Sequence, residues 1–268
     1  MAIISLMTDF GLKDGNVGVM KGVIWNICPE VQIADLSHLI GAQNIREAAL
    51  ILARSAPYFP KGTIHVVVVD PGVGTERRAM AARLGDSFYV GPDNGIVTLL
   101  LERVAAENQP CQYVRLDNAK YHLQNVSHVF HGRDIFSPAA AHLACGVPLA
   151  SLGTAFSDPV TIDLPKPVRT EQGLRGEVIH IDHFGNIASN IRVEDLAEAL
   201  PRKQQIAVRI GRTEIIGLVD TFGERPLGEV IALLGSTGNL IVSVVNGNAA
   251  ETLHAKVGDK IEALFRVE

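Results

Sequence analysis

The sequence predicts an α/β protein in two parts: an N-terminal, mostly parallel α/β sandwich domain, followed by a smaller all-β, barrel-like C-terminal domain. Three observations support this prediction. Strand-like and helix-like apolar patterns alternate over roughly the first 150 residues. Residues 64–69 form a β-branched run of the kind found in strands that are covered on both faces. After residue 173 the apolar segments become short and closely spaced, as in a small sandwich or barrel.

The elements of the first part follow from local patterns. Residues 3–7 are an apolar run typical of a strand, and they end in a polar turn. A helix is predicted next, because apolar side chains recur at helical spacing at Val17, Met20, Val23, Ile24 and Ile27. Asn44 stands three residues before Glu47, as in a capping box, and the helix that it begins ends before Pro57. The strand at 64–69 follows, so a parallel sheet is expected.

A domain boundary is predicted where Pro165 and Pro167 interrupt a polar segment. We expect the N-terminal domain at residues 1–165, a linker at 166–173 and the C-terminal domain at 174–268. Short strands separated by glycine and asparagine turns are predicted in the C-terminal domain at residues 178–181, 206–210, 215–219, 230–234, 240–244 and 260–264.

The composition excludes several classes of function. The 24 Lys and Arg residues against 29 Asp and Glu give a net charge of −5, without the basic stripe that a nucleic-acid backbone requires. Cys28, Cys111 and Cys145 lack metal-binding spacing and are typical of buried thiols in a reducing compartment. The apolar start is too short for a signal sequence or a membrane span. We therefore expect a cytoplasmic protein with no metal, nucleic-acid partner or membrane.

The first candidate binding loop lies at residues 8–16, between a strand and a helix. Ligands of open parallel sheets bind beyond the carboxyl ends of the strands, where such loops gather. This loop carries Asp9 and Asp14 five residues apart. One interpretation is that Asp14 or Asn16 merely caps the following helix. The other is that Asp9 accepts hydrogen bonds from sugar hydroxyls, and the spacing alone leaves both open.

The second candidate loop, at residues 70–78, is rich in glycine but fits neither common nucleotide motif. Arg77 stands where a dinucleotide fingerprint needs its third glycine, and the Gly-Lys-Ser/Thr of a phosphate-binding loop is absent. What remains is a carboxylate, Asp70, and an arginine seven residues later. The pair can be an ordinary salt bridge that closes the loop, or part of a site.

A third segment, residues 129–138, places His131 between an aromatic residue and a glycine, just before an apolar helix at 139–144. A single histidine is more often structural than catalytic. If His131 lies near Asp70, however, the two form a base and the group that orients it, which is the arrangement needed to take a proton from water.

Polar turns of the second part lie at residues 181–186, 234–239 and 245–250. Asp, Asn and Gly are ordinary turn residues, so these segments need no function. An aromatic face beside an amide also suits an adenine ring, which would stack on Phe184 and receive an edge hydrogen bond from Asn186.

Taken together, these segments resemble the S-adenosyl-L-methionine (SAM) hydroxide adenosyltransferases, relatives of the fluorinase and the chlorinase. The resemblance covers nearly the whole chain, through residues 8–11, 70–78, 130–136, 181–186 and 248–250. It implies a SAM hydrolase in which water, or hydroxide formed from it, displaces methionine from C5′ of the ribose and gives adenosine and L-methionine. SAM is then the substrate, and neither a cofactor nor a metal is implied.

The resemblance also implies roles for individual residues. Asp70, Arg77 and His131 would surround the attacking water and form the catalytic group. The substrate-binding residues would be Asp9 at the ribose hydroxyls, Asp14 and Asp182 near the methionine ammonium, Phe184, Phe222 and Asn186 around the adenine, Ser236 at the methionine carboxylate, and the backbone of Asn248 and Ala249 at the adenine edge.

The chain departs from the halogenating relatives at several positions. These relatives have an arginine where Thr237 stands, tyrosines where Asp70 and His131 stand, and a serine where Gly132 stands. The hydroxyl that would hold a halide is therefore missing, which favours hydroxide. The resemblance further implies a homotrimer whose site lies between the first domain of one subunit and the second domain of its neighbour.

Three alternatives to hydrolysis can be stated for the same residues. A SAM-dependent halogenase is disfavoured, because a halide needs no base of the kind that Asp70 and His131 supply. A nicotinamide-dependent oxidoreductase is disfavoured by the missing third glycine. A non-catalytic module that binds adenosine or SAM stays open, since the same polar loops could position a ligand without turnover.

Overall fold

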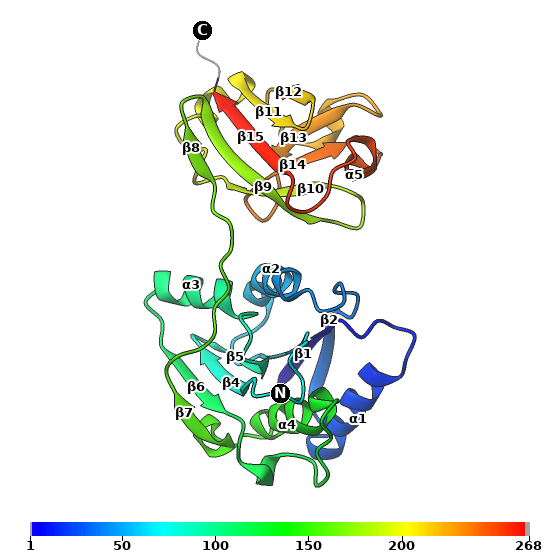
Figure 1. The fold of residues 1–268 in the computed structure, drawn as a ribbon, viewed down its shortest axis with the longest axis vertical. Coiled ribbons are helices and arrows are strands. Elements are labelled where there is room, and N and C mark those ends of the chain that lie inside the picture. Colours follow the sequence, from blue (N-terminus) through cyan, green and yellow to red (C-terminus); the bar gives the residue numbers. More distant parts are fainter. Residues whose placement is uncertain (1, 266–268) are drawn as a thin grey trace. The chain divides into compact units, whose positions relative to one another are not determined.

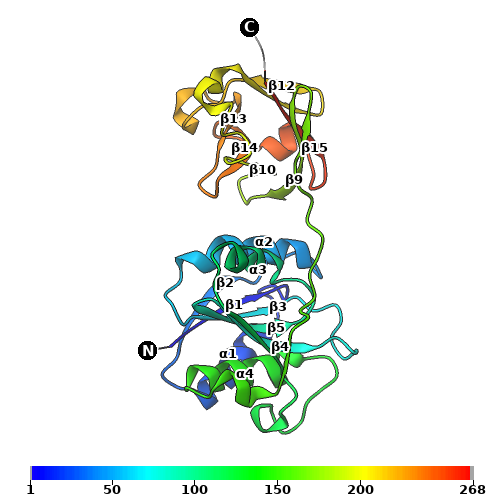
Figure 2. The same ribbon diagram turned by 90° about the vertical axis from the view of Figure 1, so that its left-hand side faces the viewer.

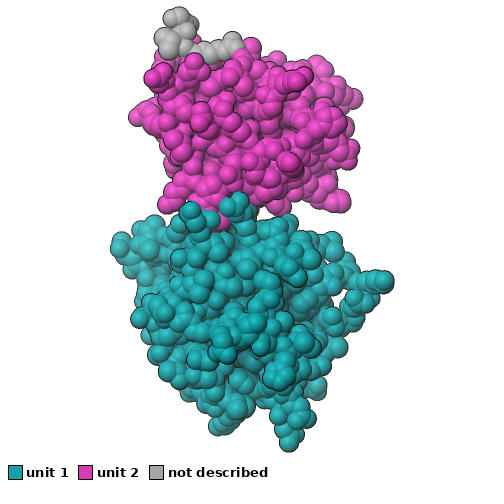
Figure 3. Space-filling model, viewed as in Figure 1, with its two compact units in different colours: residues 1–163 teal, residues 164–268 magenta. Residues whose placement is uncertain are grey.

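The protein is described here by a computed structural model of residues 2–265, which form two compact units. The first unit ends at Asp163 and the second begins at Leu164 (Figure 3). The segment expected as a linker, 166–173, contains strand β8 (Val168–Thr170) and the first residue of β9 (Gly173–Ile181). Thr170 pairs with Gly173 across a tight turn, so the hairpin begins directly after Pro167.

A seven-stranded sheet forms the centre of the first unit, in the order β2-β1-β3-β5-β4-β6-β7 (Figure 1). Strands β2, β1, β3 and β5 are mutually parallel. Strand β4 is antiparallel to β5, and β6 is antiparallel to β4, so β6 points the same way as the parallel strands. The mostly parallel sheet predicted from the sequence is confirmed. The strands are β1 Ile3–Thr8, β2 Gln32–Ser37, β3 Ile64–Val68, β4 Ala79–Leu84, β5 Ser87–Pro92, β6 Cys111–Arg115 and β7 Thr154–Phe156.

Helices cover both faces of this sheet (Figures 1 and 2). Helices α1 (Asn16–Ile27) and α4 (Ser137–Ala144) pack on one face, and α2 (Ile45–Ser55) and α3 (Thr98–Ala106) on the other. The β-branched run of β3 supplies both cores, because Val66 and Val68 point to one face and Val67 to the other. Full burial of each such side chain contributes about 1.5–3 kcal/mol.

The two helix starts examined in the sequence differ in how they are capped. Asn44 accepts a hydrogen bond from the backbone N–H of Glu47 at 3.1 Å, so the predicted cap of α2 is confirmed. Helix α1 begins after Gly15 without a side-chain cap. The interpretation that Asp14 or Asn16 merely caps this helix is therefore not supported.

The second unit is an antiparallel sheet whose main path is β12-β11-β15-β9-β10-β14-β13, with β8 paired to β9. A bridge between Val219 and Leu233 links the segment after β12 to β13, so the sheet nearly closes, and the predicted barrel-like architecture is confirmed. The predicted strand at 215–219 stops at 216, where Gly217 has a φ of +79°. The remaining elements are β10 Ile187–Arg192, β11 Ile206–Ile210, β12 Thr213–Ile216, β13 Val230–Leu234, β14 Asn239–Val244, α5 Ala249–Thr252 and β15 Lys260–Phe265.

Two observations bear on the environment expected for the chain. Between residues 2 and 265, no helix is both long and apolar enough to cross a bilayer. The cysteines are free thiols. Cys28 is buried as predicted, Cys111 is only partly buried, and Cys145 is exposed, so the prediction of a buried thiol is wrong at Cys145. Cys145 follows the last residue of α4, where the helix end faces solvent.

Candidate active site

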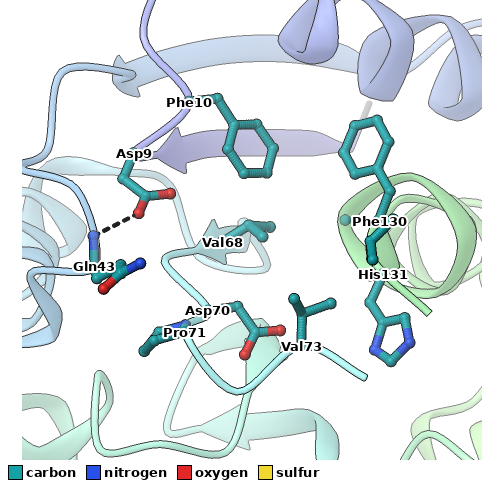
Figure 4. A pocket seen from close by; sticks show the side chains of 11 residues that line it. Asp9, Phe10, Gln43, Val68, Asp70, Pro71, Val73, Phe130 and His131 are labelled. Carbon is teal, nitrogen blue, oxygen red and sulfur yellow. Dashed lines mark hydrogen bonds between the residues drawn. The ribbon is translucent and has the colours of Figure 1, made fainter. Parts of the chain in front are cut away.

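A cavity of about 260 Å³ lies in the first unit beyond the carboxyl ends of β1 and β3. Figure 4 shows Asp9 and Gln43 on one side of it and Phe130 and His131 on the other. The lining residues are Asp9, Phe10, Gln43, Val68, Asp70, Pro71, Val73, Val129, Phe130, His131 and Gly132. Three residues predicted from the sequence, Asp9, Asp70 and His131, therefore face one cavity, as expected for loops at the carboxyl edge of a parallel sheet.

Asp9 is held at this cavity by the backbone of Gln43. Its Oδ2 accepts a hydrogen bond from the Gln43 N–H at 2.7 Å. Gln43 has a φ of +62°, which is uncommon for a residue other than glycine. Such conformations persist where the surrounding structure enforces them, and they cluster at functional sites. Here the unusual backbone directs an N–H at a pocket carboxylate.

Asp70 follows β3 and forms a buried ion pair with Arg77. The Arg77 Nε donates to Asp70 Oδ1 at 3.1 Å and Nη2 donates to Oδ2 at 2.6 Å, so the contact is bidentate. The side chains are only 4% and 8% exposed, respectively. The Arg77 guanidinium also lies 5.4 Å from the centre of the buried Phe136 ring. The pair is therefore not a surface salt bridge: Asp70 lines the cavity, and Arg77 lies behind it.

The loop 70–78 approaches the segment before His131 closely. Gly74 has a φ of +77°, and a Cβ atom there would lie 2.3 Å from the carbonyl oxygen of His128. Only glycine fits this contact without moving the backbone. Gly74 thus allows two chain segments to lie in contact. The glycines of this loop need no nucleotide-binding role, in agreement with the sequence, which fits neither nucleotide motif.

His131 precedes a short π-helical turn, Gly132–Phe136, which leads into α4. The Ser137 hydroxyl donates to the Gly132 carbonyl at 2.7 Å and supports this turn. Single π-helical turns are rare and occur often at functional sites. The turn places the imidazole beside Arg77, whose Nη2 lies 3.1 Å from Nδ1 of His131.

This contact fixes the proton on the imidazole. A guanidinium has no acceptor, so Nδ1 of His131 must accept the hydrogen bond from Arg77. The ring proton therefore resides on Nε2. Burial and then the Arg77 cation lower the pKa of His131, although Asp70 acts in the opposite direction. His131 is accordingly a neutral imidazole with an N–H donor available at Nε2.

The pKa of the Asp70 carboxyl group is shifted in the opposite direction, upward. Burial raises the pKa of Asp70, and the charge and hydrogen bonds of Arg77 only partly offset this effect. The sequence predicted that Asp70 would orient His131 directly. In the structure Arg77 takes that place, because its Nη2 contacts both Asp70 and His131.

Four of the residues expected at the adenine lie together in the second unit. Asp182 Oδ1 accepts from the N–H groups of Phe184 and Asn186, and its Oδ2 accepts from the Asn186 side chain at 2.8 Å. This turn leaves Phe184 73% exposed. The N–H of Ala250 donates to the Gly185 carbonyl, which brings the start of α5, with Asn248 and Ala249, against the same turn.

The other predicted residues are not gathered by any contact described for residues 2–265. Asp14 is exposed in the loop before α1, Phe222 is 45% exposed in a short helical turn, and Ser236 is exposed between β13 and β14. Their roles stay predictions. Over the same residues, His, Cys, Asp and Glu side chains form no group of three or more that could hold a metal ion.

Gln43 and Phe130 are among the lining residues that the sequence did not predict as site residues. Gln43 lies between β2 and α2, and Phe130 packs edge-on against Phe10 at a ring distance of 5.7 Å. Gln43 lies beyond the carboxyl end of β2, next to β1 in the sheet, and finding it required β2, which the sequence did not predict. The contact of Phe130 with Phe10 joins segments 120 residues apart, and no local pattern signals it.

The chain is similar to several known proteins over 90% or more of its length. A family model described as the SAM hydroxide adenosyltransferase N-terminal domain matches residues 4–153, and its C-terminal counterpart matches residues 176–262. An "(R)-S-adenosyl-L-methionine hydrolase" of Salinispora tropica is 42% identical over 96% of each chain. A fluorinase of an Actinoplanes species is 29% identical over 90% of each chain. The crystal structure of an uncharacterized conserved protein from Thermotoga maritima matches with a TM-score of 0.89 and 37% identity, over 97% of this chain and 99% of the other.

Proposed function

This chain belongs to the SAM hydroxide adenosyltransferase family, and from that premise we propose that it is a SAM hydrolase acting on the (R) epimer at sulfur. Water attacks C5′ of the ribose, and adenosine and L-methionine are released. The observation that carries the proposal is the single cavity faced by Asp70, His131 and Asp9, with Arg77 joining the first two. The configuration at sulfur is taken from the name of the Salinispora relative.

The chemistry demands a base but no acid. The leaving group is a neutral thioether released from a sulfonium, so it needs no proton. Water is a poor nucleophile until it loses a proton, since its pKa in bulk is about 15.7. The attack combines a developing anion with a cation, and a site with little water favours such a loss of charge once the nucleophile has formed.

Asp70 is the proton acceptor in this proposal. The His131 Nδ1 already accepts from Arg77 and its Nε2 carries a proton, so the neutral imidazole has no free lone pair for the water proton. The raised pKa of Asp70 makes it a stronger base than an exposed carboxylate. The water proton goes to Asp70, the O–C5′ bond forms, and the electron pair of the C5′–S bond goes to sulfur.

His131 and Arg77 complete the arrangement. The Nε2–H of His131 is the donor that can hold the water oxygen, while Arg77 keeps Asp70 ionised until it receives the proton. Nη1 of Arg77 is buried and has no partner among residues 2–265, so this cation retains donor capacity inside the protein. Arg77 does not line the cavity, and it acts from behind the two groups that do.

Binding of the substrate is assigned to both units. Asp9 holds the ribose hydroxyls, and Phe184, Phe222 and Asn186, with the backbone of Asn248 and Ala249, surround the adenine. Asp14 and Asp182 lie near the methionine ammonium, and Ser236 meets the carboxylate. The preformed turn at Asp182, which exposes the face of Phe184 and fixes Asn186, supports the adenine assignment.

Halogenation is the nearest alternative, and the surroundings of Gly132 count against it. A Cβ atom on Gly132 would lie 3.3 Å from Met20 Sδ and 3.3 Å from a Phe130 ring carbon. A serine hydroxyl for a halide would therefore require these neighbours to move.

We also propose that the enzyme works as a cytoplasmic homotrimer that needs no metal, with each site shared between neighbouring subunits. A shared site would explain why ligand residues are divided between the two units.

Incubation of the purified chain with each SAM epimer in ¹⁸O-labelled water tests the activity. We expect adenosine labelled at the 5′-hydroxyl, together with methionine, to form faster from the (R) epimer, and turnover by the Asp70→Asn control to be strongly reduced. Binding without product would favour the non-catalytic module. A 5′-halo-5′-deoxyadenosine formed in the presence of chloride or fluoride would favour the halogenase, and equal rates for both epimers would reject the stereochemical assignment.

A further inference from the structure

A buried histidine outside the catalytic group contacts the loop that carries Asp9. His38 directly follows β2, next to the end of β1, and its side chain is 3% exposed. Its Nδ1 lies 2.9 Å from the hydroxyl of Thr8, which is fully buried. Its backbone carbonyl accepts a hydrogen bond from the N–H of Gly11 at 2.8 Å. His38 thus binds the chain on both sides of Asp9.

Three neighbours, Thr8, Phe10 and Asp35, define the contacts of the His38 ring and of the hydroxyl that it meets. The Thr8 Oγ1 accepts from the N–H of Phe10 at 3.2 Å, so its own hydrogen is free to be donated to Nδ1 of His38. Nε2 of His38 lies 3.0 Å from a carboxylate oxygen of Asp35, a close contact whose geometry is not that of a hydrogen bond. The negative charge of Asp35 favours the tautomer that carries the ring proton on Nε2, which leaves Nδ1 as the acceptor for Thr8. Lys21 donates to the other oxygen of Asp35 at 2.7 Å. Burial raises the pKa of Asp35, but the hydrogen bond from Lys21 and the nearby His38 outweigh it and lower that pKa.

These contacts determine where Asp9 points. The Thr8 hydroxyl closes a turn over Asp9 by bonding to Phe10, and His38 fixes the hydroxyl in that direction. With Gly11 also tied to His38, the backbone at Asp9 has little freedom, and its carboxylate meets the N–H of Gln43 at the cavity. A loop held in this way is ready to bind before the ligand arrives, which avoids the cost of ordering it.

We propose that His38 is a positioning residue that aims Asp9 at the ribose hydroxyls of the ligand. The inference rests on the proposed function, because it takes the ribose role of Asp9 from there. His38 does not line the cavity, so we expect it to act without contacting the ligand. Its effect is on affinity for the ribose and not on the chemical step at Asp70.

The two ring nitrogens of His38 allow a matched pair of variants. Asparagine places an oxygen near the position of Nδ1, so His38→Asn can still accept from Thr8. Glutamine reaches the position of Nε2, so His38→Gln keeps the contact with Asp35 and loses the acceptor for Thr8. We expect His38→Gln to raise the Kd of adenosine and the KM of SAM on the order of five- to tenfold, with kcat nearly unchanged. His38→Asn should stay close to the wild type.

Another buried histidine of the same sheet serves as the control. Nδ1 of His65 lies 2.7 Å from the hydroxyl of Ser5, also on β1, and His65 is 1% exposed. This pair is not at the cavity. His65→Gln should therefore lower the stability of the protein without raising the Kd of adenosine. Should His38→Gln fail to fold, Thr8→Val removes the same hydrogen bond and should raise the Kd equally.

A ligand without the ribose hydroxyls separates positioning from general damage. By calorimetry, His38→Gln should weaken the binding of adenosine but leave the affinity for 2′,3′-dideoxyadenosine unchanged. The double variant His38→Gln with Asp9→Ala should bind adenosine no more weakly than Asp9→Ala alone. Equal losses for both ligands, additive losses with Asp9→Ala, or equal behaviour of the Asn and Gln variants would overturn the inference. The proposed function fails separately, if the wild-type chain releases no adenosine from SAM.

Discussion

Replacing Arg77 by methionine tests whether one guanidinium controls the protonation of both pocket groups. Methionine has a similar length and fits an apolar site, so the change removes the charge and three hydrogen bonds with little loss of volume. The pKa of Asp70 should rise, because burial then acts without an opposing cation. The pKa of His131 should also rise, because Arg77 contributes to lowering it.

The magnitude follows from the burial and closeness of the pair. Opposite unit charges about 4 Å apart attract by about 4 kcal/mol at the effective dielectric constant of about 20 that suits protein sites. The Asp70 and Arg77 side chains are 4% and 8% exposed and 2.6 Å apart at their closest atoms, so solvent screens them little. Removal of one partner from a buried pair costs about 3–5 kcal/mol as long as the other stays charged. Asp70 avoids most of this cost by taking up a proton, which removes the base.

The assay is the pH dependence of kcat/KM, measured as adenosine released. The active form has Asp70 ionised and His131 neutral, so activity falls as the pH is lowered and both groups take up protons. In Arg77→Met this acid limb should move to higher pH. Arg77→Lys should lie between, since an ammonium keeps the charge but lacks the planar fork that meets both Asp70 oxygens. Arg78→Met is the matched control, because Arg78 pairs with Asp93 and Asp158 instead. An acid limb that stays in place while the rate falls at every pH would refute the reasoning.

Three further predictions concern individual residues. Asp70→Asn should lower kcat by about two to four orders of magnitude with a nearly unchanged Kd for SAM, and adding His131→Ala should cost little more, as single-turnover kinetics of the double variant can establish. Asp9→Ala should instead raise the Kd of adenosine, and a normal affinity in calorimetry would reject its ribose role. Burial lowers the pKa of His65 from 6.5 to about 4, so stability present above pH 6.5 is lost as the pH falls to about 4, by up to about 3 kcal/mol; urea unfolding of His65→Asn, which does not titrate, should show a smaller loss.

The fold could be predicted where local sequence determines structure. The apolar run of β1, the β-branched run of β3 and the cap at Asn44 each rely on neighbouring residues, and the structure confirms them. Strand β2 was not predicted, because its sequence mixes Gln, Asp and Ser with apolar residues and extends only through pairing with β1. Strands β4, β6 and β7, which complete the mixed sheet, also depend on pairing with neighbouring strands. No local sequence pattern predicts their direction.

The site was predictable in its residue types but not in its hydrogen bonds. Asp70 and His131 stand out in their segments, yet the direction of each bond depends on Arg77, which is 54 residues from His131 in the chain. A direct Asp70–His131 pair would draw the water proton toward the imidazole, whereas a guanidinium between them can only donate. Arg77 therefore favours a charged carboxylate and an uncharged imidazole at the same time, which are the two states that proton transfer to Asp70 requires. A donor-only cation between an acid and an imidazole thus decides which of the two is the base.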